Sequence, residues 1–137
     1  MITVSVMYPH REGCTFDMDY YCKVHMGLVR ELLGGDLKAL QAEQGIRGSE
    51  PGSPEHYAAI GRLTFDSLDI FRAAFRIHGK ALMDDIVNFT NIEPIVQVGE
   101  IMLMCRPKIL CSNTKRRLAP IASRRFVVRA CRRFDQA

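Results

Sequence analysis

Residues 16–29 read FDMDYYCKVHMGLV and have the pattern of an amphipathic helix. Asp17 is a suitable N-cap, because its side chain can accept a hydrogen bond from a backbone N–H of the first turn. Phe16 precedes this cap and is placed to pack on Tyr21 as a hydrophobic staple. Gly34-Gly35 is expected to end the helix. The side chains expected to face the interior recur at helical spacing and are Tyr21, His25, Leu28, Val29 and Leu32.

Strand patterns lie on both sides of this helix. Residues 2–8 alternate apolar and polar side chains, which predicts a strand before it. Residues 37–45 predict a weaker second strand, and residues 57–65 predict a third. Residues 92–104 predict the last strand, which Pro94 limits near its start.

A second helix is expected between the third and the last strand. Asp66 or Ser67 is the expected N-cap, and Gly79 is a candidate position for a break or kink. The helix is expected to end before Phe89. Its inward side chains are Leu68, Phe71, Phe75, His78 and Leu82.

The predicted order of elements is βαββαβ, which is typical of an α+β, ferredoxin-like fold. In this arrangement both helices cover one face of an antiparallel sheet. The last strand has apolar side chains on both of its sides, however, and a bare apolar face is a liability for a monomer. We therefore expect a homodimer, in which a second copy covers the other face. Ile95, Ile101 and Leu103 point to one side of the strand, and Val96, Val98, Met102 and Met104 to the other.

Composition divides the 137 residues into two segments. Residues 1–104 have nine Lys and Arg against fourteen Asp and Glu, whereas residues 105–137 have ten against one, and together these give the net charge of +4. We expect residues 1–104 to form one domain and residues 105–137 to be a basic extension, irregular or disordered. Binding of nucleic acid is not expected, because the basic segment lacks the signature of any nucleic-acid-binding module.

The sequence favours a cytoplasmic location. No basic region precedes residues 2–8, so a signal peptide is not expected, and no stretch is apolar enough to predict a membrane span. The number of cysteines is odd and no pair has the CxxC spacing, which favours a reducing compartment.

Residues 16–29 resemble the FD-x-x-YY-x-x-x-HMPLV signature of the EthD family, in the dimeric α+β-barrel superfamily. Gly27 stands where that signature has proline. Three further stretches resemble the family in the same order: Gly52-Ser53-Pro54, residues 61–67 (GRLTFDS) and residues 88–97 (NFTNIEPIVQ). The resemblance covers nearly all of residues 1–104. It implies a two-chain barrel with a small-molecule cleft in each subunit, between the helices and the sheet.

The resemblance also implies a range of functions. Fungal relatives are dehydratases or decarboxylases of polyketide-derived aromatics, other relatives are linked to ether degradation, and many bacterial members carry a reductase label. Related barrels include isomerases, cyclases and cofactor-free monooxygenases. We therefore expect cofactor-independent acid/base chemistry, of lyase, isomerase or dehydratase type, on a small apolar carbonyl or polyketide-like compound. The alternative is a non-catalytic protein that binds a hydrophobic metabolite for an oxidising enzyme system.

His25 is the predicted general base, because an imidazole beside a partly apolar cleft can abstract a proton next to a carbonyl. A core histidine bonded to a carbonyl or a carboxylate is the structural alternative. Tyr20 and Tyr21 diverge by roughly 100° around the helix. Tyr21 is four residues from His25, so it is better placed to hydrogen-bond the substrate carbonyl. Its structural alternative is a packing aromatic.

Further candidates are side chains that suit an apolar pocket, although aromatic and Met side chains at this spacing often belong to the core. No metal or cofactor is predicted, because the four histidines lie in separate elements and neither a phosphate loop nor a GxGxxG motif occurs. The predicted substrate-binding side chains are Phe65, Phe75, His78, Met83 and Phe89.

Overall fold

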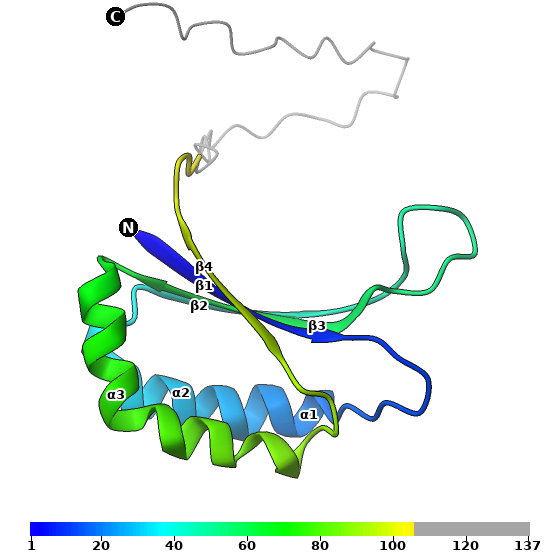
Figure 1. Ribbon diagram of the computed structural model, residues 1–137, viewed down its shortest axis with the longest axis horizontal. Helices are drawn as coiled ribbons and strands as arrows, with labels where there is room; N and C mark the ends of the chain where they lie inside the picture. The colour runs from blue at the N-terminus through cyan, green and yellow to red at the C-terminus, as the bar shows by residue number, and fades with distance from the viewer. Residues whose placement is uncertain (106–137) are drawn as a thin grey trace, which may run out of the picture. The chain divides into compact units, whose positions relative to one another are not determined.

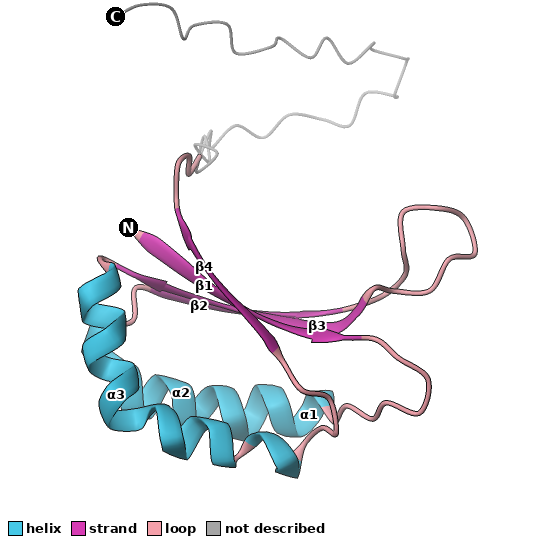
Figure 2. Ribbon diagram, in the orientation of Figure 1, coloured by secondary structure: helices cyan, strands magenta, loops and turns pink. Residues whose placement is uncertain are grey.

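The computed structural model describes residues 1–105 and contains one antiparallel sheet of four strands, in the order β2-β3-β1-β4. Both helical segments lie on the same face of this sheet (Figures 1 and 2). This confirms the predicted α+β, βαββαβ fold. The predicted basic extension lies outside the described residues, apart from Cys105. The strands are β1 (Ile2–Pro9), β2 (Ala39–Gln44), β3 (Tyr57–Phe65) and β4 (Ile95–Glu100).

The helices lie side by side beneath the sheet (Figure 1). Each helix begins at a side-chain N-cap that the sequence predicts. Asp17 Oδ1 accepts a hydrogen bond from the Tyr20 N–H at 3.0 Å. Of the two candidate caps of the second helix, Ser67 is the one used, since its Oγ accepts from the Ile70 N–H at 3.3 Å. The helical elements are α1 (Met18–Tyr20), η1 (Tyr21–His25), α2 (Met26–Leu33), η2 (Gly34–Asp36), α3 (Leu68–Asp84) and η3 (Ile86–Asn88).

The first helix contains a π-helical turn, η1, that its sequence pattern does not predict. The Met26 N–H bonds to the Tyr21 carbonyl, five residues back, instead of the usual four. This extra residue in the turn shifts the inward face of the following helix by one position. Val29 is buried as predicted, but Leu33 is buried in place of Leu32, and Leu28 and Leu32 are only half-buried.

The second helix continues through Gly79, so the break considered at this position is wrong, although α3 bends along its course (Figure 1). A Cβ atom built on Gly79 would lie 2.8 Å from the Phe75 ring. Gly79 therefore makes room for an aromatic side chain one turn earlier.

The last strand is shorter than residues 92–104, and that prediction is wrong at both ends. Glu100 pairs with Ile2, the first residue of β1, so residues after 101 have no neighbouring strand to bond to. Only Ile101 continues the ladder, through its N–H to the Met1 carbonyl at 3.0 Å. Met102 and Leu103 are consequently 85% and 81% exposed.

The sheet face away from the helices is more polar than the last strand alone predicts. Ile95 lies there and pairs with Met7, which pairs in turn with Ile60, so one apolar row crosses β4, β1 and β3. An ion pair between Arg62 and Glu43 crosses from β3 to β2 on this face. The apolar face expected opposite the helices is therefore present only in part, because the next row, Gln97, Ser5 and Arg62, is polar. Polar side chains on this face are Thr3, Ser5, Gln41, Glu43, Arg62, Thr64 and Gln97.

The core lies between the helices and the inner face of the sheet. Tyr8, Tyr21 and Phe65 are its largest fully buried side chains. Burial of such apolar surface is the main force that holds helices on a sheet. No helix among residues 1–105 is long and apolar enough to cross a membrane.

The Tyr21 hydroxyl lies directly over Gly61, in the middle of β3. A Cβ atom built on Gly61 would be 2.4 Å from this oxygen but 3.7 Å from the ring carbon that carries it. Phe16 packs on the Tyr21 ring at 5.1 Å between centroids, as the predicted staple requires, and Phe89 packs on it at the same distance. The ring therefore has little freedom to move away from β3.

Gly61→Ala is expected to lower the free energy of unfolding by about 1–3 kcal/mol, the usual penalty of overpacking. The matched control is Gly99→Ala in β4, where a new Cβ would meet only Thr3, at 3.9 Å. Adding Tyr21→Phe to Gly61→Ala removes the clashing oxygen and should restore most of the loss. Urea denaturation of the four proteins measures this. Equal stability of the two Gly→Ala variants would contradict the account.

Candidate active site

The imidazole of His25 bonds to the carboxylate of Asp85 across the two helices. Nδ1 of His25 is 2.7 Å from Oδ2 of Asp85, although the two residues are 60 positions apart in the chain. His25 ends the π-helical turn, and Asp85 directly follows α3. The two side chains are 8% and 13% exposed, so water screens this contact poorly.

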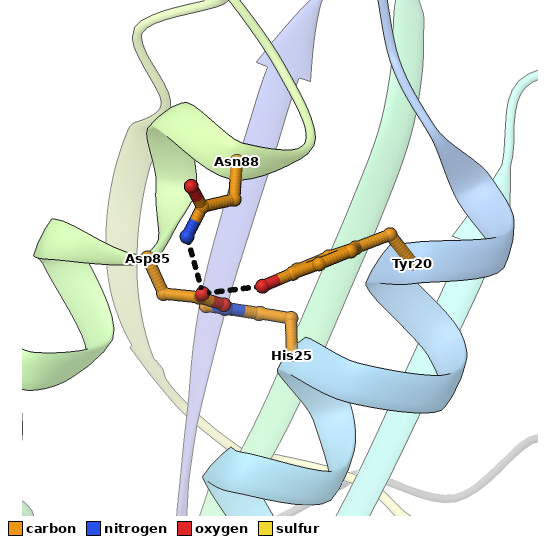
Figure 3. A network of polar contacts seen from close by, with 4 residues as sticks. All are labelled: Tyr20, His25, Asp85 and Asn88. Carbon is orange, nitrogen blue, oxygen red and sulfur yellow. Dashed lines mark hydrogen bonds and ion pairs between the residues drawn. The ribbon is translucent and has the colours of Figure 1, made fainter.

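Two further side chains hold the other oxygen of Asp85 in place (Figure 3). The Tyr20 hydroxyl donates to Oδ1 at 2.8 Å, and the Asn88 amide donates to the same atom at 2.9 Å. Burial raises the pKa of Asp85, but hydrogen bonds from Asn88, His25 and Tyr20 outweigh it, so the pKa lies below its ordinary value. The hydrogen bond to Asp85 in turn raises the pKa of Tyr20. Asp85 is therefore an ionised carboxylate at neutral pH.

This network fixes which nitrogen of His25 carries the proton. An ionised carboxylate can only accept hydrogen bonds, so Nδ1 of His25 must be the donor. In the neutral imidazole Nε2 then has a free lone pair. Nε2 forms no hydrogen bond with any of residues 1–105, and no fully buried side-chain nitrogen or oxygen in this range lacks a partner. An Nε2 that keeps some accessible surface is consistent with both observations.

A mostly apolar cavity of about 390 Å³ adjoins His25. It lies between the inner face of the sheet and the helices, and its walls come from β1, β3, β4, the first helix and α3. Such a volume falls in the range that small-molecule sites occupy. The cavity is lined by Val4, Val6, Tyr8, Tyr21, His25, Met26, Val29, Leu33, Leu63, Phe71, Phe75, Leu82, Met83, Ile86, Val96 and Val98.

The ring of Tyr21 stacks on the ring of His25, with centroids 5.6 Å apart and planes only 13° from parallel. Burial raises the pKa of Tyr21 far above its ordinary value, so its hydroxyl stays a neutral donor. An uncharged O–H beside a base with a free lone pair is the arrangement needed to polarise a carbonyl while a neighbouring proton is removed.

The structure brings four of the seven sequence-predicted site residues to the cavity: His25, Tyr21, Phe75 and Met83. Phe65 is fully buried and packs on Phe71 instead. Phe89 is also buried and lies outside the lining, but its ring contacts His25, with centroids 4.7 Å apart. His78 is half-buried on α3 and does not line the cavity.

Sequence reasoning missed the residues that act on His25 from elsewhere in the chain. Asp85 has no local signal, because its partner lies 60 residues away. Tyr20 does have a local signal, because it stands beside Tyr21 in the motif of residues 16–29. Tyr20 does not line the cavity, yet it shares the Asp85 carboxylate with His25. Within the described range, no three His, Cys, Asp or Glu side chains are grouped so that they could hold a metal ion.

Asp85→Asn is expected to remove part of the acid sensitivity of the fold. Because the pKa of Asp85 is below its ordinary value of 3.8, its carboxylate stabilises the folded state above about pH 4, and this contribution is lost as the pH falls through the folded pKa. The stability difference between wild type and variant should therefore be present at pH 6 and shrink as the pH falls below about 4. Urea midpoints across this range measure it. Asp84→Asn, which alters the neighbouring exposed carboxylate, is the control. A difference that is constant with pH contradicts the assignment.

Comparison with known proteins shows which family this chain is similar to. The EthD domain model matches residues 15–93, a range that includes both His25 and Asp85. The crystal structure of an EthD-like protein from Ralstonia eutropha JMP134 is 39% identical over 74% of this chain and 92% of that protein, with a TM-score of 0.72.

A second solved structure shares the fold. It is an ethyl tert-butyl ether (EthD) family protein from Bacillus halodurans C-125, 21% identical over 74% of this chain and 99% of that one, with a TM-score of 0.58. No curated protein matches the chain. The family model and the first of these structures together establish that this chain belongs to the EthD family.

Proposed function

We propose that this protein binds a small, largely apolar carbonyl compound and removes a proton from the carbon next to the carbonyl, without a cofactor. The observation that carries the proposal is the His25–Asp85 pair on the wall of an apolar cavity. A base held in one tautomer beside an apolar space of this size has the groups that such a reaction needs.

In the proposed step, Nε2 of His25 takes the proton from the α-carbon. The electron pair of the broken C–H bond moves toward the carbonyl, whose oxygen becomes an enolate. The Tyr21 hydroxyl donates a hydrogen bond to this oxygen, and Asp85 stabilises the imidazolium that forms. Return of the proton from His25 to another carbon gives an isomerase. In a dehydratase the enolate re-forms the carbonyl as a C=C bond forms between the α- and β-carbons, and the β-hydroxyl leaves as water with the proton from His25.

A purely structural role for the same pair is the competing explanation. His25 and Asp85 join the first helix to the end of α3, and removing either side chain would leave the other poorly paired. The two explanations differ in what they require of Nε2. A structural tie uses only Nδ1, whereas catalysis needs Nε2 to be free and accessible. The bond to Asp85 uses Nδ1, and Nε2 bonds to none of residues 1–105.

His25→Ala is expected to abolish deuterium exchange at the α-carbons of 2-tetralone and 2-indanone in D₂O, followed by NMR. These small ketones stand in for the unknown substrate and report proton removal alone. Loss of a general base lowers the rate by about 10²–10⁴-fold. Asp85→Asn should also lose most exchange, because an amide facing Nδ1 favours the tautomer with the proton on Nε2.

His78→Ala is the matched control, since it removes a half-buried histidine of α3 that does not line the cavity. It should exchange like wild type. Circular dichroism checks that every variant is folded. Exchange that persists in folded His25→Ala, or wild-type protein that accelerates exchange of neither ketone, overturns the proposal.

The second candidate function is non-catalytic binding of a hydrophobic metabolite for a partner enzyme. The observation that favours it is the cavity lining itself, in which only Tyr8, Tyr21 and His25 have polar side chains. It predicts ligand binding that survives His25→Ala and no proton exchange by the wild type. The same NMR experiment, with ligand titration added, separates the two functions.

We also propose that the protein is a homodimer that pairs near β4. The support is the group of exposed apolar residues on this edge strand and just after it, including Ile95 at 52%, Val96 at 51% and Leu103 at 81%. An exposed apolar strand edge is a common site of pairing between chains.

Native mass spectrometry should therefore give twice the 15.5 kDa chain mass. Leu103→Lys is expected to shift the protein toward monomer, because it places a charge in the apolar segment after β4. Ile77→Lys, at a site 72% exposed on α3, should not. Monomeric wild type at micromolar concentration, or dimers unaffected by Leu103→Lys, contradicts the proposed interface.

A further inference from the structure

Tyr8 provides a second phenol in the cavity, from the opposite layer to Tyr21. It lies near the end of β1, whereas Tyr21 and His25 come from the first helix. All three residues line the cavity. The Tyr8 and Tyr21 rings meet edge to face, with centroids 5.8 Å apart. The sheet and the helix thus each bring one phenol to the same space.

The Tyr8 side chain is only 1% exposed, yet its hydroxyl bonds to none of residues 1–105. Every fully buried side-chain nitrogen or oxygen in this range has a partner, so the Tyr8 oxygen must keep some accessible surface, like Nε2 of His25. Tyr8 is otherwise enclosed and lines the cavity, so the cavity is the space from which a ligand could reach this hydroxyl. The same argument applies to the Tyr21 hydroxyl. Two donors that lack protein partners therefore face one apolar space.

We propose that Tyr8 is a second catalytic donor, and that the site takes an uncharged ketone whose oxygen is held between the Tyr8 and Tyr21 hydroxyls. This inference rests on the proposed function, because the oxygen in question is the one that becomes the enolate. A carbonyl oxygen has two lone pairs and can accept from both phenols at once. Each hydrogen bond strengthens as negative charge develops on that oxygen.

The charge of the surroundings selects the substrate class. The cavity lining contains neither Lys nor Arg, and the ionised Asp85 lies directly behind His25. A carboxylate or phosphate ligand would lose its water without gaining a counter-ion and would be repelled by Asp85. Burial raises the pKa of Tyr8 far above its ordinary value, so at neutral pH this phenol is a donor without charge.

Packing alone does not explain the Tyr8 hydroxyl. The ring contacts Phe16 and Phe89, with centroids 5.0 and 5.9 Å away, and a phenylalanine would make the same contacts. The hydroxyl adds a polar group to an apolar wall, and a ligand oxygen is the partner that would satisfy it. A test must therefore separate the ring from its oxygen.

The experiment measures binding of 2-naphthol, the aromatic counterpart of the enol of 2-tetralone, and of naphthalene, which lacks the oxygen. Tyr8→Phe should weaken 2-naphthol binding roughly tenfold, the loss expected for one hydrogen bond, and leave naphthalene binding unchanged. It should also slow exchange of 2-tetralone. Tyr57→Phe, which alters a half-buried tyrosine of β3 that does not line the cavity, should change none of these.

Three results would overturn the inference: equal 2-naphthol affinity in wild type and Tyr8→Phe, equal losses for naphthol and naphthalene, or tighter binding of the anion 2-naphthoate than of 2-naphthol. Failure of the proposed function looks different. In that case wild type would not accelerate exchange, whatever the effect of Tyr8→Phe on naphthol binding. The naphthol series thus tests the oxygen site separately from the base.

Discussion

The hydrogen bond between His25 and Asp85 depends on how two distant parts of the chain are tied together. The backbone N–H of Asp17, the first helix cap, bonds to the Phe89 carbonyl at 2.8 Å, just after the turn that holds Asp85. Asn91 adds to this tie, since its side chain accepts from the Thr15 N–H and donates to the Gly13 carbonyl. The start of the first helix and the end of α3 therefore have one fixed relation, and the 2.7 Å contact follows from it.

Helix and sheet contribute different chemistry to the cavity. The first helix carries the proposed base and one phenol, held together by stacking of the Tyr21 and His25 rings. The sheet contributes Tyr8. It also contributes Gly61, which has no side chain and so leaves room for the Tyr21 oxygen. A change in any of these positions therefore alters the distance between the proposed donor and the proposed base, even where the change is in a strand.

Local patterns in the sequence predict most of the fold, because strands and helices follow from side-chain periodicity and caps from single residues such as Asp17. They do not predict the π-helical turn, since its extra residue becomes visible only when Leu33, and not Leu32, is buried in the core. They also predict which side of a helix or strand faces inward, but not which inward residue borders an empty space. Phe65 was consequently expected in the cavity and belongs to the packed core. Asp85 needs three-dimensional information, because nothing near it in the chain indicates a partner on the first helix.

The buried polar network is itself an argument for chemistry at this site. A buried ion pair is weak evidence for stability, because apolar side chains of similar volume often stabilise a core as well or better. The surroundings of His25 are suited to that alternative, since Tyr21 and Phe89 already form an aromatic cluster around it. Instead, Tyr20 and Asn88 hold one oxygen of Asp85 and leave the other to orient the imidazole. Four polar side chains that together fix one tautomer at the wall of an apolar cavity therefore support the proposal that His25 is a base.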